Sequence, residues 1–360
     1  MTMLDAQSAP PSSRFSPRRL LPIVASQQAA LLVLIAIQIV IFSFTGNNFL
    51  SSDAAFDIVR QGLEVGLLAI ALTPVIVTGG IDLSVGSLMG LSAVILGKLW
   101  RDAHWPMAAA IAGTLALGLA AGFVNGSLIT RLRIPPLIVT LGTFSLFRGL
   151  AEGITHGADN FTGLPESFTT LGQGTFWGGI PKQLPILVIV AIVFWILLHR
   201  SIIGRQLTAI GFTPAGARYA GIAVERRLML AYILCGLISS LAAVIYVAHN
   251  GQAKADAGTN YELSAIAAVV LGGTSIFGGR GSIIGTLLGW LAIAILQQGL
   301  RLSDGPTELV GILTGGLLIL AIVLNQRLAA FAGKRRASII PQAARPDRRD
   351  ESRPTQASPL

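Results

Sequence analysis

The sequence predicts an all-α polytopic membrane protein, and three observations support this fold class. Of the 360 residues, 52% are hydrophobic and 12% are charged, whereas about 25% of the residues in a soluble globular domain are charged. The mean hydropathy is +0.70. The apolar residues gather in long runs, several of them close to the roughly 20 residues that a helix needs to cross a bilayer. The chain therefore has too little charge for a surface that faces water throughout.

About ten transmembrane elements are expected along the chain, one or two of them broken or re-entrant. The uninterrupted apolar runs are 29–44, 106–127, 184–198, 228–247 and 309–326. The run 61–79 contains Pro74, which removes a helical hydrogen bond. The run 134–151 opens with two prolines, which suit a first helical turn. The runs 84–99 and 282–299 each follow a glycine-rich break, and 263–271 covers less than half of the hydrocarbon core at about 1.5 Å per residue.

Ten crossings place both tails on one side of the membrane, and the basic residues indicate that this side is the cytoplasm. Most of the 26 Lys and Arg residues fall in the tails and in the loops on the same side, as the positive-inside rule requires. The net charge of +9 therefore reflects topology, and no nucleic-acid partner is expected. The expected regions are an N-tail over 1–27, a transmembrane domain over 28–327 with a cytoplasmic loop over 199–227, and a basic, disordered tail over 328–360. The segments 45–60, 100–105, 152–183, 248–262 and 300–308 are expected on the outer side.

The sequence contains no recognisable set of residues for covalent catalysis or metal binding. The only cysteine, Cys235, excludes an intrachain disulfide, and the four histidines are far apart. The stretch GGTSIFGGRGS at 272–282 lacks the Lys-Ser/Thr pair of a phosphate-binding P-loop, so any ATP chemistry requires another chain. Asp82, Arg148 and Arg280 lie near span ends. The lack of an acid or histidine in the middle of a span disfavours a proton-coupled transporter, whereas sodium coupling through carbonyl groups stays open.

The stretch TGGIDLSVGS at 78–87 places glycines, hydroxyl groups and an acid between two apolar runs. Gly79 and Gly80 are expected to end one helix. Asp82 or Ser84 is expected to cap the next helix by accepting hydrogen bonds from its free N–H groups. Two interpretations stay open, a well-capped cytoplasmic hairpin and a break that lines a transport route, since irregular backbone at membrane depth is tolerated only in protein-buried or water-lined places.

A second stretch of the chain resembles the first. VIVTGGIDLSVGSLMG at 75–90 and VVLGGTSIFGGRGSIIG at 269–285 share an aliphatic run, a Gly-Gly pair, a small polar residue and a Gly-Ser pair that opens the next helix. The second stretch has two extra residues between these features. Paired, glycine-interrupted apolar segments point to a transport pathway, although chance similarity in glycine-rich membrane sequence is the competing explanation. The helix before the second break is short, so Gly272-Gly273 is the stronger candidate for lining a pathway.

The loop 199–227 is too polar to span a membrane, and a short helix is expected inside it. Thr213 and Pro214 are typical of the first two positions of a helix, and Gly221 of its end. One interpretation is an interfacial helix on anionic lipid. The other is a docking helix for a cytoplasmic partner, which could approach closely over the small residues Ala215, Gly216, Ala217 and Ala220.

Four long motifs occur in a fixed order: VTGGIDLSVGS at 77–87, NGSLITRLRIPPLIVTLGT at 125–143, a GR-x-x-x-A-I-G…A-R-x-A-G-I pattern at 204–222, and YELSAIAAVVLGGTSIFGGRGSIIGT at 261–286. Together they resemble the permease subunits of bacterial ABC importers for monosaccharides, of the ribose/xylose/arabinose/galactose type in the branched-chain amino acid and sugar permease superfamily. The resemblance covers about residues 30–326. It implies a non-enzymatic transport subunit of the bacterial inner membrane that imports a pentose or hexose by alternating access.

The resemblance also implies partners and site residues. The permease would form a homodimer in the lipid bilayer, with an ATPase that carries ATP-Mg on the cytoplasmic side and a sugar-binding protein on the periplasmic side. The residues that would couple to the ATPase are Thr213, Pro214, Ala215, Ala217, Arg218 and Gly221. Because sugars are neutral and rich in hydroxyls, the pathway candidates include the small hydroxyl residues Thr78, Ser84, Ser87, Thr274 and Ser275. The glycines of the two breaks are the other candidates, namely Gly79, Gly80, Gly272 and Gly273. Related permeases carry nucleosides or a furanose signal molecule, and a stand-alone secondary transporter is the rival class.

Overall fold

The structure is a computed structural model that describes residues 24–303 together with 306, 309, 311–313, 315, 316 and 319. The described part consists of helices joined by turns and irregular connections, with two isolated β-bridges. The helices are α1 (Val24–Thr45), α2 (Ser52–Val77), α3 (Val85–Arg101), α4 (Met107–Thr130), α5 (Pro136–Ile154), α6 (Glu166–Gln173), η2 (Trp177–Gly179), α7 (Leu184–Trp195), η3 (Ile196–Arg200), α8 (Ile202–Phe212), α9 (Pro214–Tyr219), α10 (Val224–Asn250), α11 (Tyr261–Leu271) and α12 (Ile283–Leu302). The predicted disordered tail and most of the predicted span 309–326 lie outside the described residues.

The length and composition of these helices identify a polytopic membrane protein. Among the described residues, 6 helices are long and apolar enough to cross a membrane, namely α1, α2, α4, α5, α10 and α12. The segment of α7 with η3 forms a bent pair with α8, at 66°, and would be a seventh. The sequence predicts ten elements. Of the others, α3 has 17 residues and α11 has 11, so the count of ten crossings stays a prediction.

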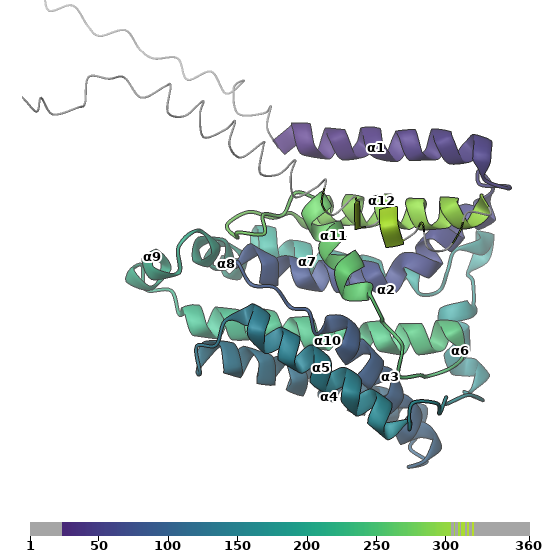
Figure 1. Ribbon diagram of the computed structural model, residues 1–360, viewed down its shortest axis with the longest axis horizontal. Coiled ribbons are helices and arrows are strands. Elements are labelled where there is room, and N and C mark those ends of the chain that lie inside the picture. Colours follow the sequence, from purple (N-terminus) through teal and green to yellow (C-terminus); the bar gives the residue numbers. More distant parts are fainter. Residues whose placement is uncertain are drawn as a thin grey trace, which may run out of the picture.

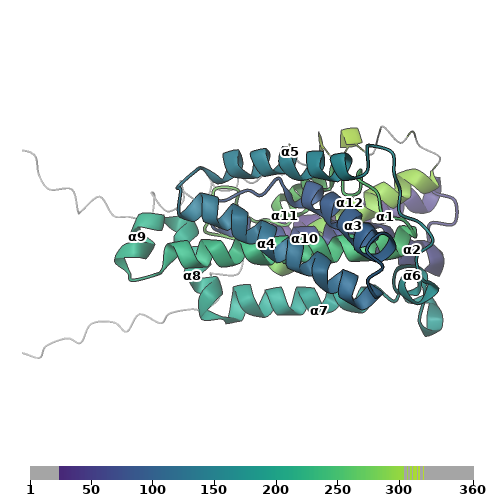
Figure 2. The same cartoon turned by 90° about the horizontal axis from the view of Figure 1, so that it is seen from below.

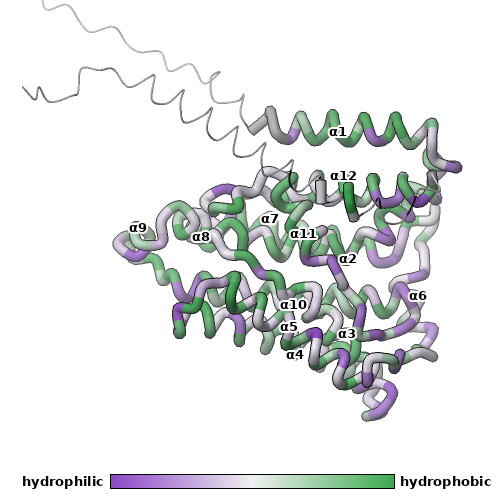
Figure 3. Tube along the Cα trace, in the orientation of Figure 1, coloured by the Kyte–Doolittle hydropathy of each residue, from purple (hydrophilic) through white to green (hydrophobic). Residues whose placement is uncertain are grey.

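The helices form a bundle whose two ends are marked by short elements. Figure 1 shows α9 projecting at one end and α6 lying at the opposite end, which we call the α9 end and the α6 end. Seen from below, α5 and α7 lie on opposite sides of the bundle (Figure 2). Hydrophilic residues gather toward the two ends, whereas the middle is mainly apolar (Figure 3). This distribution suits a bilayer, in which water is found only beyond the ends of the helices.

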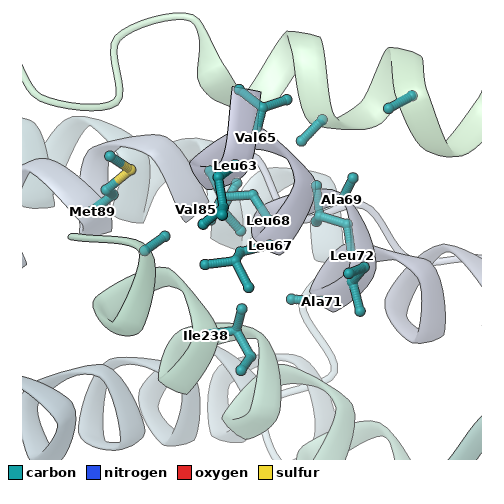
Figure 4. Close-up of a cluster of buried hydrophobic side chains, with 14 of the residues drawn as sticks. Leu63, Val65, Leu67, Leu68, Ala69, Ala71, Leu72, Val85, Met89 and Ile238 are labelled. Atoms are coloured by element: carbon teal, nitrogen blue, oxygen red, sulfur yellow. The ribbon is translucent and has the colours of Figure 1, made fainter. Parts of the chain in front are cut away.

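Helix α2 is the centre of the bundle. Every residue from Gly62 to Val77 is buried, and the helix packs against α7, α10, α11 and α12. Figure 4 shows its aliphatic side chains pointing in several directions, with Ile238 of α10 close by. A helix that is apolar on all sides is stable only when other helices surround it. The side chain of Ser51 caps its first turn through the N–H of Ala54.

Helices α4 and α10 pack closely because glycines face each other. A Cβ atom added at Gly118 would lie 2.4 Å from the carbonyl oxygen of Gly236, and one at Gly122 would lie 2.3 Å from that of Tyr232. No side chain larger than hydrogen fits at these positions. Small residues at such contacts let two membrane helices approach along their backbones.

The connection between α10 and α11 differs from the expected outer loop over 248–262. Ala253 and Ala257 in this connection are buried, and the connection packs against the first turns of α3. A Cβ atom at Gly86 would lie 2.5 Å from the carbonyl oxygen of Gly258. Helix α11 therefore begins beside the start of α3, within the bundle. Small residues on both sides allow this contact, which local sequence patterns do not reveal.

Candidate functional site

A cavity of about 350 Å³ lies toward the α9 end and brings together two of the predicted functional segments. Thr78, Gly79 and Gly80 line it from the end of α2, and Pro214 and Arg218 line it from α9. The turn between α4 and α5 and the start of α10 complete its walls. We call this space the α9-end cavity. The glycine-rich break and the predicted docking helix thus share one site.

Helix α2 ends at the break through local backbone geometry. Gly79 adopts the left-handed conformation, with φ of 83°, which favours glycine. The N–H of Gly79 donates to the carbonyl of Ile76, and that of Gly80 donates to Val75. This pair of bonds is a Schellman motif, which satisfies the last carbonyl groups of a helix. The helix therefore ends where its glycines predict.

The predicted cap residue Asp82 acts just before α3 rather than inside its first turn. Its Oδ1 accepts hydrogen bonds from the backbone N–H and the hydroxyl of Ser84, at 2.9 and 2.6 Å. Ser84 itself is the N-cap residue but makes no side-chain capping bond. Its hydroxyl instead accepts from the Asn125 amide at 2.9 Å. The carboxylate thus fixes the turn that leads into α3, and the Ser84 hydroxyl connects this turn to α4.

The predicted pathway residues Ser84 and Ser87 are enclosed by protein. Both side chains are buried, and the Ser87 hydroxyl donates to the carbonyl of Ser84. Neither residue lines the α9-end cavity, whereas Thr78, Gly79 and Gly80 do. In this conformation the end of α2 lines the cavity, whereas the start of α3 is enclosed within the bundle.

The second break ends α11 in the same manner as the first ends α2. Gly273 has φ of 95°. Its N–H donates to Val270, and the N–H of Thr274 donates to Val269. The segments 75–80 and 269–274, which the sequence aligns, thus share one hydrogen-bond pattern. Gly272 packs against Gly285 and Thr274 is buried. None of the pathway candidates Gly272, Gly273, Thr274 and Ser275 lines the α9-end cavity.

The two breaks touch each other and α8 at a single junction. The N–H of Gly279 donates to the carbonyl of Val77 at 2.8 Å. A Cβ atom at Gly211 of α8 would lie 1.9 Å from the oxygen of Val77 and 2.3 Å from the nitrogen of Gly279. Only glycine fits there. The loop that carries α9 is therefore in backbone contact with both breaks.

Helix α9 has the cap residues that the sequence predicts. The Thr213 hydroxyl accepts from the N–H of Gly216 at 3.3 Å, and Pro214 is the first helical residue. Gly221 has φ of 78° and ends the helix through a bond from its N–H to the carbonyl of Arg218. The Arg218 side chain forms an ion pair with Glu225 of α10, with 2.7 Å between Nη2 and Oε1.

Ala217 points inward and is not available to a docking partner. It is 3% exposed and packs with Ile210 and Val224 in a small apolar cluster. The exposed residues at this end include Ala215 and three aromatic side chains, since Phe212 is 64%, Tyr219 94% and Phe277 77% exposed. Helical periodicity over six residues is too short to have revealed which side of α9 is buried.

A buried acid, which the sequence patterns do not predict, lies in the middle of α2. Glu64 is 1% exposed, and its Oε1 lies 3.3 Å from Nδ1 of His249 on α10. An acid and a histidine therefore meet inside the bundle, contrary to the expectation that none lies there. The interruption of the apolar run 61–79 by Glu64 is the sequence feature that could have indicated a buried acid. Its partner His249 lies 185 positions away and cannot be identified from local sequence.

Comparison with known proteins identifies the family. The model for "Branched-chain amino acid transport system / permease component" matches residues 54–322. The chain is similar to the Autoinducer 2 import system permease protein LsrD of Photorhabdus temperata, with 40% identity over 299 residues, 82% of this chain and 89% of the relative. It is also similar to the protein of that name from Yersinia enterocolitica, with 39% identity over 301 residues, 82% of this chain and 90% of the relative. No solved structure matches significantly.

The family model covers α2 to α12, which include both breaks, the α9-end cavity and the docking helix. Its match agrees with the resemblance that the four sequence motifs carry. The relatives are named as permeases of an import system, and thus as transport subunits rather than enzymes. This chain belongs to the permease family of ABC importers described as the branched-chain amino acid transport system permease component.

Proposed function

We propose that this permease imports a monosaccharide or a related hydroxyl-rich solute into the cytoplasm, powered by an ATPase on a separate chain. The observation that carries the proposal is the α9-end cavity, in which the end of α2 and the docking helix form walls of one space. A movement of α9 would change the cavity and the adjoining break together. ATP and Mg²⁺ would bind to the partner, and this chain would perform no covalent chemistry.

The proposed topology places the α9 end in the cytoplasm of a bacterium and the α6 end at the periplasmic face of the inner membrane. A homodimer of this chain would form the complete pathway. An ATPase would contact α9, and a binding protein would deliver the solute at the α6 end. Alternating access requires that these partners bind two conformations with different affinities. The contacts of Gly211 with both breaks support such coupling.

The relatives provide a second candidate substrate. They are named for the import of autoinducer 2, which favours a signal molecule as the alternative to a pentose or hexose. A stand-alone secondary transporter is disfavoured by the family match. Because Glu64 and His249 meet inside the bundle, the family match is the observation that disfavours a proton-coupled transporter.

The decisive experiment measures ATP-dependent uptake by the permease reconstituted with its ATPase and binding protein, with D-ribose, D-xylose, D-galactose and autoinducer 2 as solutes. Tyr219→Glu should abolish co-purification of the ATPase and reduce uptake at least tenfold, because an exposed aromatic contact becomes a charge. Trp177, which is 99% exposed near the α6 end, provides the matched control, and Trp177→Glu should retain the ATPase.

Uptake that persists without the ATPase would contradict the proposed function. Unchanged ATPase co-purification with Tyr219→Glu would contradict the docking assignment of α9. Uptake of autoinducer 2 in preference to all three sugars would select the signal-molecule alternative.

A further inference from the structure

A second cavity of about 360 Å³ lies toward the α6 end, among α2, α10, α11 and α12. We call it the polar cavity, because its walls carry Asp57, Arg60, Glu64, His249, Tyr261 and Arg301. Small-molecule sites in proteins commonly have volumes of about 300–1,000 Å³. The polar cavity is thus large enough for a small solute, and it is separate from the α9-end cavity.

The acidic and basic side chains around the polar cavity are equal in number, and one acid and one base form an ion pair. Asp57 lies 3.4 Å from Arg60, and Glu64 lies 3.3 Å from His249. The Arg301 guanidinium donates to the Gln298 side chain at 2.7 Å. With histidine neutral, two acids and two arginines leave no net charge among the described lining residues. A ligand with a net charge would therefore find no excess of opposite charge in the cavity walls, whereas a neutral ligand would find donors and acceptors.

Glu64 indicates that this cavity has a role beyond packing. It lies in α2 among residues that are buried and almost all apolar. Burial of a carboxylate destabilises a fold unless partners compensate for its lost hydration, and a single histidine contact compensates it only partly. Ionisable groups inside membrane segments are by default candidates for ligand or ion sites.

We propose that the polar cavity binds a small neutral polyhydroxylated solute, of the size of a monosaccharide, on its way in from the α6 end. Acid side chains would accept hydrogen bonds from its hydroxyl groups, and Arg60 and Asn250 would donate to them. The rings of Tyr246 and Tyr261, which also line the cavity, present apolar faces with polar tips. This assignment names a solute subsite of the proposed importer and depends on that function for the direction of transport.

The test measures how fast an introduced cysteine reacts with maleimide, which is possible because the chain has a single native cysteine. Cys235 is 0% exposed, so the wild-type protein should not react with a membrane-impermeant maleimide. Gln61→Cys places a thiol on the cavity wall, and Ala158→Cys places one on the exposed connection after α5 as a control. Both thiols should react with maleimide added outside intact spheroplasts.

The probes are D-ribose, D-xylose, L-arabinose, D-galactose and autoinducer 2, with D-gluconate as an anionic and L-leucine as a zwitterionic comparator. At least one neutral probe at millimolar concentration should slow modification of Gln61→Cys threefold or more and leave Ala158→Cys unchanged. The same protection should be lost when Glu64→Gln is added, and retained when Glu152→Gln changes an exposed acid of α5.

Several results would overturn the assignment. The first is that no neutral probe protects the thiol of Gln61→Cys from maleimide, and the second is that gluconate or leucine protects it equally well. The third is protection that persists when Glu64→Gln is added. The fourth is protection by the binding protein without solute, which would identify a protein contact. Normal ATP-dependent uptake without protection would overturn this assignment alone. Protection in a protein that fails the uptake assay would support the cavity and contradict the proposed import function.

Discussion

Gly211 is the residue at which the cytoplasmic loop region meets the transmembrane breaks. Its missing side chain leaves room for the oxygen of Val77 and the nitrogen of Gly279, which a Cβ atom would approach to 1.9 and 2.3 Å. Backbone atoms cannot move aside as the tip of a flexible side chain can. The position therefore requires glycine for space rather than for conformational freedom.

Gly211→Ala should lower the free energy of unfolding of the purified permease by about 1–3 kcal/mol, the typical cost of overpacking, and should reduce uptake. Thermal unfolding followed by circular dichroism measures the first effect. Gly142→Ala is the matched control, because a Cβ atom there meets nothing within 4 Å. Equal thermal stability of the two variants would show that the junction is looser than the structure indicates.

Arg218 and Glu225 connect α9 to α10 through an ion pair that is 55% and 51% exposed. Such exposed pairs contribute about 0–1 kcal/mol to stability. Arg218→Glu should therefore leave the fold intact but push α9 away from α10, and reduce solute-stimulated ATP hydrolysis several-fold. The double variant Arg218→Glu with Glu225→Arg restores the attraction and should recover most of that activity. A double variant no better than the single one would mean that Arg218 acts on the ATPase directly.

At the scale of elements, the residues at which helices end could be predicted from the sequence. Which segments pack against one another in space could not. Gly79, Thr213 and Gly221 act through bonds to residues within five positions, and local sequence contains that information. The packing of 251–260 on α3 and the approach of Glu64 to His249 join segments far apart in the chain. A single sequence gives no measure of such distances.

The candidate site was predictable to the same extent. The sequence predicts the break at 78–80 and the helix 214–219. It does not predict that the two segments line one cavity. Ala217 illustrates the limit. Its small size fits a docking surface and a packed cluster equally well, and only its contact with Ile210 and Val224 distinguishes the two.

At the scale of the whole molecule, the outward faces of the bundle are apolar where lipid or a second copy would lie. Leu32, Leu141 and Ile189, on α1, α5 and α7, are each more than half exposed. This distribution, together with the polar ends (Figure 3), agrees with a multi-pass membrane protein.

Topology reporters fused after residues 158, 213 and 360 should test the expected orientation. The fusions after residues 213 and 360 should be active only with a reporter that functions in the cytoplasm. The fusion after residue 158 should be active only with a reporter that functions in the periplasm. The cytoplasmic signal at residue 360 is expected if the tenth predicted span, 309–326, crosses the membrane after α12. A periplasmic signal at residue 360 would contradict an even number of crossings.

The glycine contact between α4 and α10 limits how the bundle can move. With the carbonyl of Gly236 set against Gly118, and that of Tyr232 against Gly122, neither helix can slide along the other without a backbone collision. Closely packed surfaces of this kind have discrete arrangements rather than continuous ones. The two helices therefore behave as one rigid frame. We expect a change of shape to occur outside this frame, where Gly79 and Gly273, both in the left-handed conformation, end the helices α2 and α11.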